Sequence, residues 1–255
     1  MFKFFKSNRK YEPLDYDLRK FFEYNLLWLM EEFPEPRLEE RKLLIPNTDD
    51  FPIEWNGTKQ NALDALEIVC QQMQVSADLI ELDFEESGIK EFDMGDSVIF
   101  VESDPEAPQQ FHANNSEGKS TITLAENLLD KPNTLIATLA HEIAQVRLVD
   151  EKRIAEADVM LADLSTVFFG FGLFNANAAF EFGQEFDRWG YNSLGYLKLE
   201  EWAYALALFA FLRNEDNPTW KQYLSKTLTS DFEKNLRYIA ENEDEIFKFE
   251  DEEKE

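Results

Sequence analysis

The chain has 255 residues, of which 44% are hydrophobic and 14% aromatic, so it is long enough and apolar enough to bury a core. Its formal net charge is −27 at pH 7, from 52 acidic and 25 basic side chains. This charge excludes the usual nucleic-acid and anionic-lipid binders, because clustered Lys and Arg bind phosphate groups. It favours a protein partner, above all one with a basic surface, although it also fits the simpler role of keeping the chain in solution.

Cys70 is the single cysteine, which excludes an internal disulfide and fits a reducing compartment. The N-terminal residues contain no apolar run long enough for a signal peptide. The most apolar segment, residues 167–182, is interrupted by glycines, asparagines and Glu181, so it does not predict a membrane span. We therefore expect a cytoplasmic protein without a membrane segment.

The N-terminal part, residues 1–78, predicts two helices. Residues 14–32 carry apolar side chains at helical spacing, and two prolines that follow end the helix. A second amphipathic helix is predicted from Thr58 onward. Cys70 falls on its apolar stripe and is expected to be a small buried residue.

Residues 79–124 predict a small sheet. The apolar and polar side chains of residues 79–84 alternate, and residues 98–101 and 120–124 are short β-branched runs. Residues 102–119, between the last two strands, predict a polar loop.

Residues 130–149 predict a helix that begins with Asp130 as its cap and Pro132 in its first turn. Residues 154–248 are predicted to be mostly helical. The expected helices lie near residues 154–169, 173–186, 198–213, 218–227 and 229–247, with a loop marked by Gly190, Asn192 and Gly195.

The chain contains no internal repeat and no low-complexity linker. The prediction is therefore a single α+β domain over residues 1–255, mainly helical, with the small sheet placed before the helix at 130–149. The acidic tail, residues 249–255, is expected to be frayed.

Residues 134–149, TLIATLAHEIAQVRLV, differ at one position from the H-E-x-x-H motif of zinc proteases. Side chains four residues apart share a helix face, so the two histidines of the full motif bind one zinc ion. The glutamate beside the first histidine acts as general base on the metal-bound water. A third ligand comes from the next helix, which carries E-x-x-x-D in one large branch of these enzymes.

The run STITLAENLLDKPNTLIATLAHEIAQ resembles the strand, turn and motif helix of zincin-like metallopeptidases. Roughly residues 45–225 resemble an uncharacterised bacterial family that carries H-E-x-x-H. The matching stretches are FPIEWNGTKQNALDALEIVCQQMQV, LADLSTVFFGFGLFNANAAF and LEEWAYALALFAFLR. The resemblance implies a zincin-like fold.

By this resemblance, His141 matches the first zinc ligand, Glu142 the general base and Asp163 the supporting aspartate. Gln145 stands where the second histidine belongs, and Val159 stands where the ligand glutamate belongs. Valine cannot coordinate a metal, and a neutral amide is a poor zinc ligand. The implied site is therefore degenerate.

Glu156 and Asp158 lie near Val159 in sequence and could supply a carboxylate in its place. The only other histidine, His112, is in the polar loop, and no pattern places it near the motif helix. We therefore expect no cofactor. Zinc would be bound only if the protein is a metal-dependent hydrolase, the alternative given below.

The first hypothesis is a catalytically silent zincin-like protein, a pseudoenzyme that binds a protein partner in an immunity-type, regulatory or scaffold role. Its simplest form has His141 hydrogen-bonded to Asp163 or Glu142 as a remaining polar cluster. The alternative is a metal-dependent hydrolase or peptidase in which His141 and a nearby acid hold the ion and Glu142 activates water. No Gly-x-Ser-x-Gly motif or nucleotide-binding glycine loop is present to support other enzyme classes.

Overall fold

The computed structural model describes residues 11–85, 89–93, 98–102, 111–112, 119–185 and 197–248. The acidic tail and the loop predicted at Gly190, Asn192 and Gly195 lie outside these residues.

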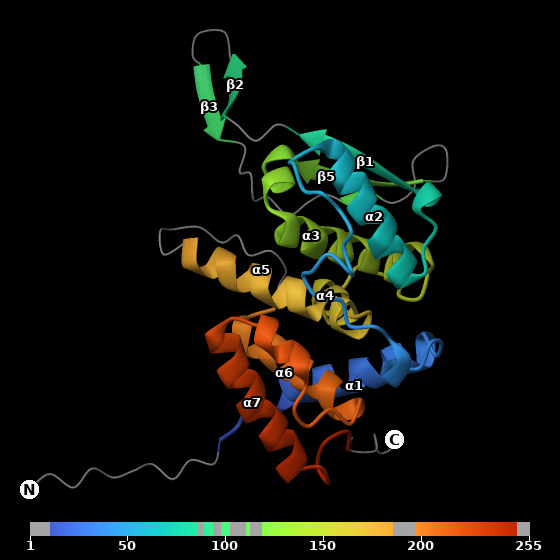
Figure 1. Ribbon diagram of the computed structural model, residues 1–255, viewed down its shortest axis with the longest axis vertical. Helices are drawn as coiled ribbons and strands as arrows, with labels where there is room; N and C mark the ends of the chain where they lie inside the picture. Colours follow the sequence, from blue (N-terminus) through green and yellow to red (C-terminus); the bar gives the residue numbers. More distant parts are fainter. Residues whose placement is uncertain are drawn as a thin grey trace, which may run out of the picture.

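Helices make up most of the described chain (Figure 1). The α-helices are α1 (Tyr16–Glu32), α2 (Lys59–Met73), α3 (Pro132–Gln145), α4 (Val159–Phe168), α5 (Gly172–Glu185), α6 (Leu199–Leu212) and α7 (Lys226–Glu241). Short 3-10 turns are η1 (Leu38–Glu40), η2 (Ala77–Leu79), η3 (Glu126–Asp130) and η5 (Thr219–Tyr223), and η4 (Val146–Asp150) is a π-helical turn.

A three-stranded sheet precedes α3, with β5 (Ser120–Ala125) between β1 (Ile80–Glu85) and β4 (Phe111–His112). β1 runs parallel to β5, and β4 runs antiparallel to it. A separate antiparallel pair, β2 (Ile89–Asp93) and β3 (Val98–Glu102), projects at the end of the molecule where this sheet lies (Figure 1). The prediction of a mainly helical α+β chain with a small sheet before the motif helix is confirmed.

Side chains fix several helix starts. The Asp15 carboxylate accepts a hydrogen bond from the Leu18 amide at the start of α1. Thr58 and Asn61 form a capping box at the start of α2. The predicted cap at Asp130 is wrong: this residue ends η3, and Lys131 precedes α3 without a capping side chain. Pro132 does occupy the first turn, where its missing N–H costs no helical hydrogen bond.

Other differences from the prediction also arise at helix ends. α4 begins at Val159 instead of 154, because the Asp158 side chain caps it. The helix predicted at 218–227 is only the turn η5, and Ser225 caps a new helix, α7, that ends at Glu241. The polar loop predicted at 102–119 contains the short strand β4, and β2 was not predicted at all.

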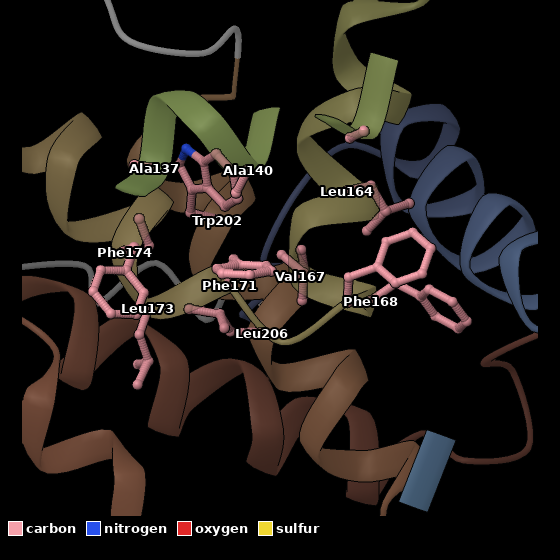
Figure 2. Packing of buried hydrophobic residues seen from close by; sticks show 14 of the residues in the cluster. Ala137, Ala140, Leu164, Val167, Phe168, Phe171, Leu173, Phe174, Trp202 and Leu206 are labelled. Atoms are coloured by element: carbon pink, nitrogen blue, oxygen red, sulfur yellow. The ribbon is translucent and has the colours of Figure 1, made fainter. Parts of the chain in front are cut away.

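The buried apolar side chains form one core cluster, with α3 and α6 inside it. α6 is buried from Glu201 to Ala210, in agreement with its almost wholly apolar sequence. Phe168, Phe171 and Phe174 are buried in this core (Figure 2). Phe169 is buried as well, and Phe180 is half-buried. Cys70 is also buried. None of the described helices combines the length and the apolar character that crossing a bilayer requires.

The turn between α4 and α5 must contain a glycine. Gly170 has φ +90°, and a Cβ atom there would collide with the carbonyl oxygen of Lys42. The Gly170 carbonyl accepts a hydrogen bond of 2.9 Å from the Leu44 amide. This close approach joins the loop after α1 to the helices that carry Asp163.

Candidate functional site

The candidate site lies on α3, which is surrounded by other elements. Almost every side chain from Thr134 to Gln145 is buried, because α3 packs against α2, α4 and α5. His141, the first residue of the motif, keeps 15% of its side chain exposed. The motif is therefore largely buried, and His141 is the most exposed of its five residues.

His141 and Asp163 are brought together as predicted. The Nδ1 atom of His141 is 2.7 Å from Oδ1 of Asp163, a fully buried residue on α4. The other carboxylate oxygen, Oδ2, accepts a hydrogen bond of 3.1 Å from the backbone amide of Leu197. Asp163 thus joins α3, α4 and the segment that leads into α6.

The pKa of His141 is raised by this environment. Burial lowers the pKa, because it penalises the charged imidazolium, but the hydrogen bond and charge of Asp163 outweigh burial, with help from Glu142. The imidazole is consequently a better base than a free histidine. Its Nδ1 atom is already committed to Asp163.

Glu142 is buried, with 5% of its surface exposed. Burial raises the pKa of its carboxyl to about 7, and the nearby His141 offsets only part of this effect. Glu142 is therefore a buried charged group of α3.

The replaced ligand positions do not supply equivalent donors. Gln145 is 6% exposed, and its Oε1 atom has no hydrogen-bond partner among the described residues. Val159, at the start of α4, lies one turn before Asp163 and presents only methyl groups. At these two positions, the one side-chain group that could accept a hydrogen bond from a ligand is the amide oxygen of Gln145, which has no partner among the described residues.

The proposed substitutes for Val159 lie in or beside the turn before α4. The Oδ1 atom of Asp158 accepts hydrogen bonds of 3.0 Å from the Met160 and Leu161 amides, so it serves as the helix cap. Glu156 is exposed to solvent. Within the described residues, no three His, Cys, Asp or Glu side chains gather in a group that could hold a metal ion.

The donor set therefore does not fit a zinc centre of the kind that the resemblance implies. One ligand position is apolar and another offers a neutral amide, so His141 is the one strong zinc ligand of the three positions. The bond between its Nδ1 atom and Asp163 does not count against a metal, because histidines that bind zinc through one ring nitrogen commonly bond a carboxylate through the other. His112 lies on β4 with its backbone opposite Thr121, and its side chain lies outside the described part of the chain.

Two buried polar groups near α3 were not singled out from the sequence. The Asn175 side chain, on α5, donates a hydrogen bond of 3.0 Å to the Ala137 carbonyl of α3. Trp202 of α6 belongs to the same cluster as Ala137 and Ala140, and its indole N–H has no partner among the described residues (Figure 2). Asparagine inside the otherwise apolar run GLFNANAAF was the available signal for the first group.

Comparison with known proteins adds no relative. No protein-family model, curated protein or solved structure matches this chain. The zincin-like resemblance therefore rests on the sequence motifs alone.

Proposed function

We propose that this chain is a catalytically silent, zincin-like protein that acts by binding a protein partner with a basic surface. An immunity-type, regulatory or scaffold role would each use such binding. The observation that carries the proposal is that Gln145 and Val159 stand at two of the three positions where the resemblance places metal ligands.

The charge of the chain supports the second half of the proposal. A net charge of −27 attracts basic surfaces over the distance of a Debye length, about 8 Å at physiological ionic strength. Complementary charge speeds association and makes it sensitive to salt. Acidic proteins and nucleic acids would be repelled by the same field.

A metal-dependent hydrolase is the second candidate, and Glu142 favours it. A carboxyl with a pKa of about 7 is suited to general acid–base chemistry near neutral pH. Strongly shifted pKa values gather at active sites, although buried structural groups show them too.

Metal analysis separates the two candidates. Protein purified without added zinc should contain no stoichiometric transition metal, and its melting temperature should be unchanged by a chelator. Stoichiometric zinc that a chelator removes, together with a fall in melting temperature, would contradict the silent-site proposal. The salt-sensitive capture of a basic protein, described below, tests the binding half.

A further inference from the structure

The exposed large apolar side chains of the described residues are concentrated near the N-terminal end of the chain. Five are exposed, and three of them are tyrosines within the first described residues: Tyr11 at 45%, Tyr16 at 52% and Tyr24 at 56%. The other two, Leu63 and Leu79, belong to α2 and η2 near the sheet. In Figure 1, α1 and α7 lie at the opposite end of the molecule from the sheet.

The two tyrosines of α1 are on its outward side. At 3.6 residues per turn, positions 16 and 24 are about 80° apart around the helix axis. Phe22 and Leu26, which are fully buried, each lie about 160° from Tyr24, while Tyr16 lies about 80° from Leu26, at the edge of the exposed side. Tyr16 and Tyr24 are 52% and 56% exposed, so a partner can contact both side chains without any change in the core.

Neighbouring side chains contact two of these tyrosines, Tyr11 and Tyr16. The Tyr11 hydroxyl donates a hydrogen bond of 2.6 Å to Oδ1 of Asn235, and its ring meets Tyr238 edge-on at 6.3 Å between centroids. The Lys20 ammonium lies 5.7 Å from the centre of the Tyr16 ring. Rings that are already ordered lose less conformational entropy when a partner binds.

Exposed acidic side chains outnumber exposed basic ones around the tyrosines among the described residues, although Lys20 and Arg19 contact the Tyr16 ring. Exposed carboxylates from residues 12–17 and from the end of α7 and the turn after it share this end of the molecule, because the Lys20 ammonium donates to the Glu245 carbonyl at 2.9 Å. They are Glu12, Asp15, Asp17, Glu241, Glu243, Asp244 and Glu245. Exposed basic groups of α7 and the turn after it are fewer: Lys226, Lys234, Arg237 and Lys248. We call Tyr11, Tyr16, Tyr24, Glu12, Asp15 and Asp17 the tyrosine face.

We propose that the tyrosine face is where the basic partner docks; this inference rests on the proposed function. Tyrosine is enriched at interface hot spots, and its ring attracts the Arg and Lys side chains that a basic surface presents. The surrounding carboxylates add charge complementarity. A second copy of this chain fits poorly, because its own acids would meet these acids across a shared face.

The test uses the full chain, immobilised, and the basic protein fraction of the native cell, obtained by cation exchange. The acidic fraction is its control. Wild type should retain a basic protein at low salt and release it at high salt. Failure of the wild type to retain any basic protein overturns the proposed function, and the docking inference with it.

Variants then test the face itself with the retained protein purified. Tyr16→Ala with Tyr24→Ala should weaken its affinity by roughly tenfold or more, as expected of hot-spot residues. The matched control, Leu63→Ala with Leu79→Ala, removes equally exposed apolar side chains from the other end and should change affinity less than about twofold. Unchanged melting temperatures would show that both variants fold.

Charge variants add an independent readout. Asp15→Asn with Asp17→Asn should slow association and reduce its salt dependence, and Asn at position 15 keeps a capping side chain for α1. A second outcome is that wild type retains a basic partner that the tyrosine variant binds with the same affinity. In that case the partner docks on another surface, and the proposed function stands. A dimer of this chain that the tyrosine variant dissociates would also overturn the choice of partner.

Discussion

Neutralising Glu142 should stabilise the protein, and the gain should depend on pH. Its carboxyl has a pKa of about 7 when folded, against 4.5 for the ordinary group. Because the folded pKa is the higher one, the folded state binds the proton more tightly, and stability falls as pH rises from 4.5 through 7. By linkage, the penalty is about 3 kcal/mol at pH 8 and less than about 1 kcal/mol at pH 5.

The variant Glu142→Gln retains the shape of the side chain and removes the ionisation. Its free energy of unfolding, measured by urea denaturation, should exceed that of wild type by about 3 kcal/mol at pH 8, and the difference should nearly vanish at pH 5. Glu67→Gln, on the exposed side of α2, is the matched control and should change little at either pH. A gain that is equal at both pH values, or no gain at pH 8, would refute the assignment of a buried carboxyl with a raised pKa.

Three further changes test the site and its surroundings. Asp163→Asn should lower the pKa of His141, as seen by NMR titration, and cost about 1.5–3 kcal/mol, more at pH 6 than at pH 9 because a raised histidine pKa stabilises the fold at low pH. Gln145→His with Val159→Glu should create zinc binding, measured by calorimetry, if the fold is that of a zincin; a folded double variant that binds none would contradict the resemblance. Arg41→Lys should lower stability by about 1–3 kcal/mol in thermal denaturation, since Nη2 donates to the Phe33 carbonyl at 2.5 Å and the guanidinium lies 4.2 Å from the Phe168 ring centre.

Periodicity predicted the helices well because long apolar stripes are a local property of the sequence. α1, α2 and α6 begin within about two residues of the predicted positions. Short strands and helix ends were less predictable. A helix end depends on which side chain accepts a hydrogen bond from a free backbone amide. Asp158 and Ser225 each start a helix where the apolar pattern alone did not.

The site was predictable in part. The resemblance to zincin-like metallopeptidases implied that Asp163 supports the motif helix, and the structure contains its contact with His141. The Leu197 amide that holds the second carboxylate oxygen carries no sequence signal, because any residue other than proline could supply it. The burial of Glu142 likewise depends on the elements packed around α3, not on its own neighbours in sequence.

The two candidate functions differ most sharply at Glu142. Asp163 has a structural role, since its two carboxylate oxygens bond one imidazole nitrogen and one backbone amide inside the core. We expect Glu142 instead to lower stability at neutral pH, and a protein retains such a group only for a use or as a remnant. If it is a remnant, Glu142→Gln will be more stable at pH 8 and will retain the basic partner with wild-type affinity, because the tyrosine face is formed by other elements, α1 and the segment before it. Loss of partner binding, or loss of a hydrolytic activity found in the wild type, would instead show that this carboxyl is functional.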